Sequence, residues 1–308
     1  MTPDDTKSGA RFEWVVIDGE RYVLKHQDVA DDWLMRATGD DVGRRYVALW
    51  EHGILDRVPD VIDHATVGCA YDGRAGAILL RDVSRGLLPL GDVPFAVDQH
   101  RRFLDRMAAL HAAFWGWRDD IGLTPLTSRY LAFSPAVAKA EAALGSTAEV
   151  PPLMAAGWSK LPAVAPAAAE VVLPLHDDPS ALLAALDTVP HTFVHGDWKA
   201  GNLGEHADGR TIVLDWGEFP GEASPLADLA WYLALNAARL PESKDATIET
   251  YRASLEAQGV GTASWWDDAL ALELLATMVQ FGWEKALGGP GPELDWWARR
   301  ARQGAQLL

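Results

Sequence analysis

Two short segments of the chain carry side chains that could do chemistry together. The first has the sequence HGDWKAGN from His195 to Asn202, and the second is Asp215-Trp216-Gly217. Each follows a strand-like run of residues. A carboxylate can orient and deprotonate a hydroxyl group, and carboxylate and amide oxygens are the ligands that Mg²⁺ takes. An isolated aspartate after a strand is more often a turn or capping residue, so the interpretation depends on the two segments together.

The order of these segments resembles the catalytic-loop and metal-binding motifs of protein kinases. Asp197, Lys199 and Asn202 have the kinase spacing, and Asp-Trp-Gly stands where kinases have Asp-Phe-Gly. Gly196 replaces the kinase arginine, and the later segment Pro225-Leu226-Ala227-Asp228-Leu229-Ala230 differs from protein kinases. Both features resemble the aminoglycoside phosphotransferase and choline kinase-like family of small-molecule kinases.

The resemblance implies a role for each residue of the motifs. Asp197 would orient the acceptor hydroxyl and accept its proton, and Lys199 would contact the transferring phosphoryl group. Asn202 and Asp215 would bind Mg²⁺. Lys25, in the segment Val23-Leu24-Lys25, would hold the α- and β-phosphates of ATP or GTP. The implied cofactors are therefore a nucleoside triphosphate and magnesium.

The nucleotide-binding part departs from the protein-kinase pattern in two ways. Only Ser8-Gly9-Ala10 precedes the first strand, so Ser8 and Gly9 are the candidates for phosphate contact in place of a full Gly-x-Gly-x-x-Gly. Arg44-Arg45 occupies the region of the helix glutamate that should pair with Lys25, which leaves Glu51 as the candidate partner or as a solvated charge at a helix end. The nucleotide base would bind at the connector Arg81-Asp82-Val83, through Asp82 and Val83.

The elements that position these residues follow from the hydrophobic pattern. Two strands over residues 12–17 and 20–25 are joined by Asp18-Gly19, which predicts a hairpin that carries Lys25. Before residue 83 the sequence also predicts a helix over 41–53 and strands over 58–66 and 77–80. After residue 83 it predicts a helix over 98–117, helices joined by loops over 130–190, strands over 192–194 and 211–214, and helices beginning at Ser224-Pro225 and Ser264.

Together these elements predict an α+β fold of the protein-kinase-like, two-lobe type. The resemblance implies a nucleotide-binding lobe over residues 1–83, with a small antiparallel sheet. It also implies a mainly helical catalytic and substrate-binding lobe over residues 84–308.

Composition excludes several classes of partner. The 308 residues include 27 Lys and Arg against 44 Asp and Glu, a net charge of −17 that disfavours nucleic acid. No apolar run approaches the roughly 20 residues needed to cross a bilayer, and the N-terminus lacks a signal-peptide pattern. The single Cys69 excludes an internal disulfide and fits a reducing compartment. We therefore expect a cytoplasmic monomer or homodimer.

The acceptor is expected to be a small molecule. Only twelve residues separate Asp215 from Asp228, which leaves little room for a peptide platform. The segments Trp265-Trp266-Asp267-Asp268 and Asp295-Trp296-Trp297, with residues 118–190, would wall the acceptor pocket. Acidic and aromatic residues there suit a cationic hydroxyl compound, although an acidic solvated surface is an equal alternative.

Three functions fit the sequence. The first is an ATP- and Mg-dependent O-phosphotransferase acting on an aminoglycoside-like or other antibiotic. A metabolic kinase for choline, an amino alcohol or a sugar shares every motif. A catalytically silent kinase-like binding module is the alternative from another class, because the glycine pattern is missing. A purely structural protein would leave the carboxylates unexplained.

Overall fold

The protein is described by a computed structural model that covers residues 9–40, 44–73 and 75–308. Ser8, a candidate for phosphate contact, lies outside the described residues. The chain forms two compact units, which are described separately. The first comprises the described residues of Met1–Arg36, Asp40–Thr124 and His191–Thr262. The second comprises Ala37–Gly39, Pro125–Pro190 and Ala263–Leu308.

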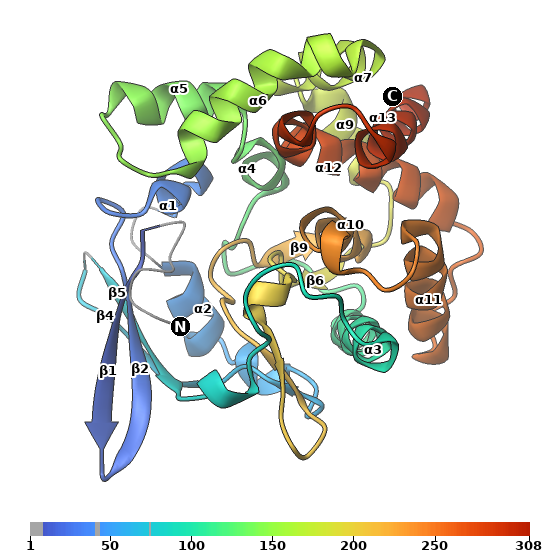
Figure 1. The fold of residues 1–308 in the computed structure, drawn as a ribbon. Helices are drawn as coiled ribbons and strands as arrows, with labels where there is room; N and C mark the ends of the chain where they lie inside the picture. Colours follow the sequence, from blue (N-terminus) through green and yellow to red (C-terminus); the bar gives the residue numbers. More distant parts are fainter. Residues whose placement is uncertain (1–8, 41–43, 74) are drawn as a thin grey trace. The chain divides into compact units, whose positions relative to one another are not determined.

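The first unit begins with an antiparallel sheet of four strands in the order β1-β2-β5-β4 (Figure 1). Its strands are β1 (Arg11–Ile17), β2 (Glu20–Gln27), β4 (Thr66–Tyr71) and β5 (Gly76–Arg81). The β1–β2 turn has φ of 50° at Asp18 and 85° at Gly19, as the tight hairpin turn requires. Lys25 lies on the inner strand β2, opposite Phe12 and Ile78, which explains how a lysine there becomes buried.

Helix α2 (Arg44–Glu51) packs against β4 and β5 (Figure 1). It was expected over residues 41–53, of which 41–43 lie outside the described part. Its buried side chains include Arg45 and Tyr46, whereas Glu51 at its end is exposed. The shorter α1 (Trp33–Thr38) precedes it.

The remainder of the first unit holds two small sheets and three longer helices. Strand β8 runs between β3 and β7, parallel to β3 and antiparallel to β7, and β6 pairs with β9. These strands are β3 (Ile62–Asp63), β6 (Thr192–Val194), β7 (Leu203–Glu205), β8 (Thr211–Val213) and β9 (Gly221–Ala223). The helices are α3 (Val97–Ala113), α10 (Leu226–Leu235) and α11 (Lys244–Ala257).

The second unit is helical and is organised around α12 (Trp266–Gly288), which contacts α4, α6, α7, α9 and α13. A Cβ on Gly157 would lie 2.2 Å from the carbonyl oxygen of Trp283, so glycine allows α6 and α12 to approach closely. The other helices are α4 (Leu126–Leu131), α5 (Pro135–Ala143), α6 (Val150–Val164), α7 (Pro166–Val172), α8 (Pro174–Asp177), α9 (Ser180–Leu186) and α13 (Pro292–Gly304).

The predicted fold class is confirmed, with an antiparallel sheet followed by a mainly helical remainder. One element was wrong: residues 58–66 do not form a single strand, because Ala65 has a φ of 58° and separates β3 from β4. The helix expected over 98–117 ends at Ala113, before Gly116 with its φ of 74°. The division at residue 83 stays a prediction.

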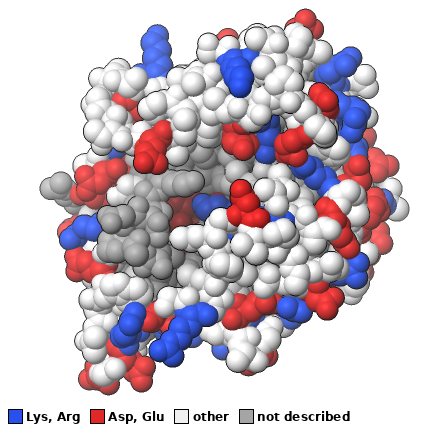
Figure 2. All heavy atoms as spheres, viewed as in Figure 1, with Lys and Arg blue, Asp and Glu red and all other residues white. Residues whose placement is uncertain are grey.

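Charged side chains are distributed rather than segregated on the visible surface. Figure 2 shows Asp and Glu interspersed with Lys and Arg among the described residues of this face, without a broad basic patch. None of the helices in the described part of the chain has the length and apolar character to span a membrane.

Candidate active site

The segment after β6 forms a tight loop that requires glycine at one position. Gly196 has a φ of 83°, and a Cβ there would lie 2.1 Å from the carbonyl oxygen of Phe219. Any side chain would therefore be both strained and blocked. This packing gives a physical reason for glycine where protein kinases have arginine. The loop delivers Asp197 directly after a buried strand.

Both carboxylate oxygens of Asp197 accept hydrogen bonds. Oδ1 accepts from the indole Nε1 of Trp231 at 3.0 Å. Oδ2 accepts from Lys199 Nζ at 2.6 Å and from Asn202 Nδ2 at 2.8 Å. Asp197 is 1% exposed, and burial raises its pKa above the ordinary value although Lys199 opposes this shift. The three donors fix the orientation of a carboxylate that has a raised affinity for a proton.

Asp228, at the start of α10, holds this loop in place. Its fully buried carboxylate accepts backbone hydrogen bonds from His195 N at 2.9 Å and Gly196 N at 2.6 Å. His111 Nε2 lies 3.1 Å from the same carboxylate. Burial alone would raise the pKa of Asp228, but the hydrogen bonds and the nearby histidines lower it. Asp228 therefore anchors the loop over residues 195–202, called the catalytic loop below, to α10. This role is structural.

His195 connects the catalytic loop to the segment that follows β8. Its Nε2 lies 3.0 Å from the carbonyl oxygen of Leu214, and its Nδ1 accepts the backbone N–H of Asp197 at 3.1 Å. These contacts define a neutral imidazole that donates from Nε2. Burial lowers its pKa, consistent with the neutral form. His195 thus packs and bonds beneath the loop that carries Asp197.

Asp215 occupies a strained position immediately after β8. Its φ is 69°, in the left-handed region that side chains rarely adopt. Hydrogen bonds of the residues before and after Asp215 keep its backbone in this conformation. Leu214 N donates to Asn202 O at 2.9 Å, and Trp216 Nε1 donates to Val213 O at 2.7 Å. The fully buried indole of Trp216 also meets the ring of His195 edge to face. These contacts fix the backbone of Asp215 one residue beyond a backbone hydrogen bond to Asn202.

Lys25 reaches this same loop from β2. Its ammonium group forms a salt bridge with Asp215 and lies 3.2 Å from Oε1 of Glu218. Burial alone would lower the pKa of Lys25, but the carboxylates of Asp215 and Glu218 raise it, so the side chain stays cationic. The structure thus brings Lys25 to the second motif segment, where its partner Asp215 lies 190 residues away along the chain.

Sequence reasoning missed Glu218. It is 7% exposed and follows Asp215 by three residues, and burial together with the Asp215 charge raises its pKa to about 8. Glu51, the expected partner of Lys25, is exposed at the end of α2. The available clue was a lone carboxylate in the otherwise uncharged stretch Trp216-Gly217-Glu218-Phe219-Pro220.

The site has more negative than positive charge. Two lysines lie among four carboxylates that interact electrostatically, so two negative charges are in excess when all groups are ionised. The six residues are Lys25, Asp32, Asp197, Lys199, Asp215 and Glu218. One divalent cation would balance this excess. Because the pKa of Glu218 is raised to about 8, the full excess is reached above that pH, and there the site is electrostatically suited to Mg²⁺.

The donor atoms also fit magnesium. Asn202 uses its amide nitrogen to bond Asp197, so its side-chain carbonyl oxygen is the atom that could bind a cation, and Asp215 adds a carboxylate. Among residues 9–40, 44–73 and 75–308, no group of three or more His, Cys, Asp or Glu side chains could hold a metal by itself. Mg²⁺ usually takes one or two protein ligands together with substrate phosphates, which matches this set.

The remaining nucleotide-binding candidates lie around the first sheet. A Cβ on Gly9 would lie 2.2 Å from Asp31 O, so packing alone requires glycine there. The side chain of Asp82 accepts from Ser84 N at 3.1 Å and lies 3.1 Å from Arg21. Val83 packs against the cluster of Ala65, Ile212 and Leu214. The roles of Gly9, Asp82 and Val83 toward a nucleotide stay predictions.

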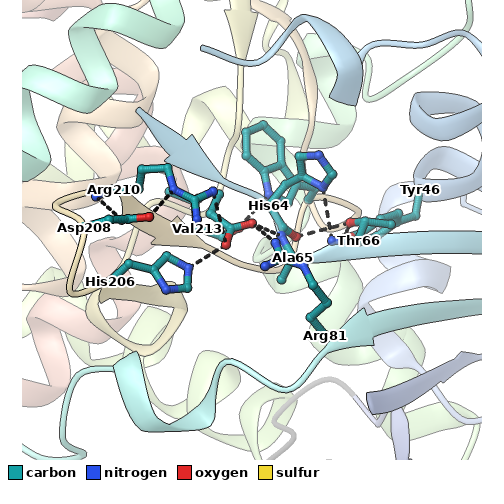
Figure 3. Close-up of polar contacts among 11 residues, drawn as sticks. Tyr46, His64, Ala65, Thr66, Arg81, His206, Asp208, Arg210 and Val213 are labelled. Carbon is teal, nitrogen blue, oxygen red and sulfur yellow. Dashed lines mark hydrogen bonds and ion pairs between the residues drawn. The ribbon is translucent and has the colours of Figure 1, made fainter. Parts of the chain in front are cut away.

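A second polar cluster, centred on the buried carboxylate of Asp63, supports the connector. Asp63 accepts from Ala65 N at 2.8 Å, pairs with Arg81, and lies 2.5 Å from His206 Nε2 and 3.9 Å from Arg210. Figure 3 shows Arg81, His206 and Arg210 converging on one region. Arg81 directly precedes the connector at Asp82-Val83, whereas His206 and Arg210 belong to the β7–β8 hairpin. Asp63 thus ties the connector to this hairpin.

The β7–β8 hairpin also carries the predicted metal ligands. Asn202 directly precedes β7, and Asp215 follows β8 by two residues. The Asp63 cluster therefore links the connector to the support of both ligands. No local motif marks Asp63, and its pairing with His206 spans 143 residues.

The tryptophans expected to wall an acceptor pocket are largely internal to the second unit. Trp266 is 2% exposed and Trp297 is fully buried. Lys285 lies 5.6 Å from the ring of Trp297, and Arg300 lies 5.3 Å from that of Trp296. These two rings already contact cations of the same unit. Their contribution to an acceptor pocket stays a prediction.

Comparison with known proteins identifies the family and the fold. The model of the family described as "Phosphotransferase enzyme family" matches residues 6–265. The curated proteins contain no match. Among solved structures, choline kinase LicA from Streptococcus pneumoniae is similar, with 13% identity and a TM-score of 0.53 over 96% of this chain and 90% of that chain. LicA in complex with AMP has 13% identity and a TM-score of 0.51, with 96% and 88% covered.

A further similar structure is that of the microcompartment-associated aminopropanol kinase. It has 13% identity and a TM-score of 0.51 over 96% of this chain and 90% of that chain. At this level of identity these structures establish the shared fold. The family match covers most of the chain and agrees with the family expected from the sequence.

Proposed function

The chain belongs to the phosphotransferase enzyme family, and from this premise we propose that it transfers the γ-phosphoryl group of ATP to a hydroxyl group of a small molecule, with Mg²⁺. The observation that carries the proposal is the meeting of Asp197, Asn202 and Asp215 with Lys25 and Lys199 in one largely buried cluster. A structural protein would have no use for this excess of buried carboxylates.

Asp197 is the proposed base. As the acceptor oxygen forms its bond to the γ-phosphorus, the bond from that phosphorus to the β-γ bridging oxygen breaks, and ADP leaves. The hydroxyl proton passes to Asp197, whose carboxylate is oriented by Trp231, Lys199 and Asn202. Orientation and charge stabilisation are the main contributions a protein makes to phosphoryl transfer. The raised pKa of Asp197 favours this proton uptake.

The lysines and the metal ligands would neutralise the negative charge of the phosphates. Lys25 would hold the α- and β-phosphates, and Lys199, 38% exposed, would contact the transferring group from beside the base. Asn202 and Asp215 would bind Mg²⁺, which neutralises phosphate charge when it is bound. Nucleotide binding fits the fold shared with LicA, for which an AMP complex is known.

The acceptor is proposed to be a small hydroxyl compound, with an amino alcohol favoured. Two of the solved structures with the same fold are named for choline and aminopropanol, both of which combine a hydroxyl group with a cationic nitrogen. The net charge of −17 attracts such a cation at long range. An antibiotic or a sugar is the alternative acceptor.

The test is acceptor-dependent ADP release. We expect turnover with Mg-ATP and at least one member of a panel of amino alcohols, sugars, aminoglycosides, macrolides and nucleoside antibiotics. Asp197→Asn should reduce this turnover by about 10²-fold or more while Mg-ATP still binds. Retained turnover in Asp197→Asn would contradict the assignment of the base, and a wild-type protein that binds no Mg-ATP in calorimetry would support a silent module. Parallel assays with GTP decide the nucleotide.

A further inference from the structure

Lys25 has two carboxylate partners, and both come from the loop that follows β8. The ammonium group pairs with Asp215 and lies 3.2 Å from Glu218 Oε1, and the side chains of Lys25 and Glu218 are 4% and 7% exposed. Asp215 and Glu218 are three residues apart in the chain. The lysine that would hold the nucleotide is therefore fixed by the metal-binding loop itself.

The helix that packs beside the sheet offers no carboxylate in this position among its described residues. The inward-facing side chains of α2 include Arg45 and Tyr46, and Glu51 is exposed at its end. A Cβ on Gly217 would lie 2.9 Å from the Tyr46 ring, so the phenol ring fills the space against the loop. The Tyr46 hydroxyl is engaged with Thr66 Oγ1 at 2.9 Å. The packing of α2 on this loop is thus aromatic rather than ionic.

One of the two carboxylates has a second proposed task. Asp215 is the proposed ligand of Mg²⁺, and a carboxylate shared with a cation holds an ammonium group less strongly because its charge is divided between the two. Glu218 Oε1 accepts a hydrogen bond from Lys25 Nζ directly, without the help of Asp215. It can hold the lysine whether or not Asp215 is engaged.

We propose that Glu218 is the positioning residue of Lys25, in the place that a helix glutamate takes in protein kinases. The inference rests on the proposed function. Because Glu218 and Asp215 belong to one loop, the phosphate-holding lysine and the metal ligand are set together, and α2 need not move to assemble the site. This differs from protein kinases, in which the position of the helix controls the ion pair.

The experiment compares Glu218→Gln with the wild type in two measurements. Calorimetry with ATP in EDTA reports the nucleotide affinity of the metal-free protein, and steady-state kinetics report KM for ATP and kcat. Both measurements are made above pH 8, because the pKa of Glu218 is raised to about 8 and its carboxylate must be ionised. We expect Glu218→Gln to weaken ATP binding and raise KM by about ten- to a hundredfold, with a smaller change in kcat, because the negative charge beside Lys25 is lost. Glu249→Gln, an exposed site on α11, is the matched control and should match the wild type.

A double-mutant cycle tests whether Glu218 acts through Lys25. In a Lys25→Met background, Glu218→Gln should cause little further loss of ATP affinity. An equal loss in both backgrounds overturns the inference, and so does wild-type ATP affinity in Glu218→Gln or a loss confined to Glu51→Gln.

Two further outcomes are separable by their own measurements. If Glu218→Gln does not fold, Glu218→Asp replaces it as the test, because aspartate keeps the charge on a shorter side chain. We expect an intermediate loss of ATP affinity in Glu218→Asp. Unchanged affinity would overturn the inference. A wild-type protein that neither binds nor uses ATP overturns the proposed function first and the inference with it. The wild-type measurement alone distinguishes that case from a failure of the role of Glu218.

Discussion

Trp231 Nε1 donates a hydrogen bond to Oδ1 of Asp197 across 3.0 Å, and both side chains are buried. Trp231 lies on α10, three residues after Asp228, which holds the backbone of the same catalytic loop. One helix therefore both anchors the loop and orients its carboxylate. Without this donor, Oδ1 would lose its hydrogen bond from Trp231, and only the two donors on Oδ2 would orient the carboxylate among the described residues.

Trp231→Phe should reduce kcat by about tenfold or more while KM for ATP stays near the wild-type value. A hydrogen bond to the ionised carboxylate stabilises that form, so its loss raises the pKa of Asp197 and moves the acidic limb of the rate profile to higher pH. The measurement is kcat/KM against pH with a saturating nucleotide. Trp115→Phe, at a site 37% exposed, serves as the control. An unshifted acidic limb in Trp231→Phe would contradict this role.

Asp228→Asn should destabilise the fold by about 3 kcal/mol, because it removes a buried charge that accepts two backbone N–H groups. Urea unfolding measures this loss directly. Asp187→Asn, an exposed site, should leave the unfolding free energy nearly unchanged. Equal stability of Asp228→Asn and the wild type would show that the loop does not depend on this anchor.

The lowered pKa of Asp228 predicts that the unfolding free energy of the protein depends on pH. The folded-state pKa of Asp228 is lowered below the ordinary 3.8, so its stabilising contribution is complete above that pH and is lost as pH falls through the lowered value. The wild type should therefore lose stability in acid more steeply than Asp228→Asn. Unfolding free energies of both proteins between about pH 6 and pH 3 test the sign. Parallel curves would refute it.

Asp63→Asn tests the link between the connector and the β7–β8 hairpin. We expect a loss of about 1–3 kcal/mol in unfolding free energy, since Arg81 and His206 are partly exposed, and a severalfold rise in KM for ATP. Asp208→Asn is the control, because among the described residues the hydrogen bonds of Asp208 stay within its own turn, to Arg210. If Asp63→Asn lowers stability and leaves KM for ATP unchanged, the cluster supports the fold without positioning the nucleotide.

The site could be predicted where chemistry restricts both residue type and spacing. Asp197, Asn202 and Asp215 were identified because two strand-end loops repeat a known order, and the structure brings them together. Glu218 and Asp63 could not be identified, because their partners Lys25 and His206 lie 193 and 143 residues away. Pairings at such distances depend on topology that local patterns do not contain.

The same limit applies to the elements. The hairpin that carries Lys25 was predicted correctly because Asp18-Gly19 determines its own turn. The strand expected over 58–66 failed at Ala65, whose left-handed backbone is held by its N–H bond to Asp63. Alanine carries no local sign of this conformation, since the constraint comes from a neighbouring carboxylate and from the pairing of β3 with β8.

Gly196→Ala separates backbone strain from steric exclusion in the catalytic loop. Gly196 and Gly209 have nearly the same φ, 83° and 87°, but a Cβ on Gly196 would lie 2.1 Å from Phe219 O whereas a Cβ on Gly209 meets nothing within 4 Å. Gly209→Ala should therefore cost only about 1–2 kcal/mol of strain, with kcat preserved. Gly196→Ala must also displace the loop from Phe219, so it should lose more stability and at least about tenfold in kcat. Thermal unfolding and ADP release on both variants decide the point: equal effects would mean that left-handed geometry alone, and not the contact with Phe219, explains the glycine before Asp197.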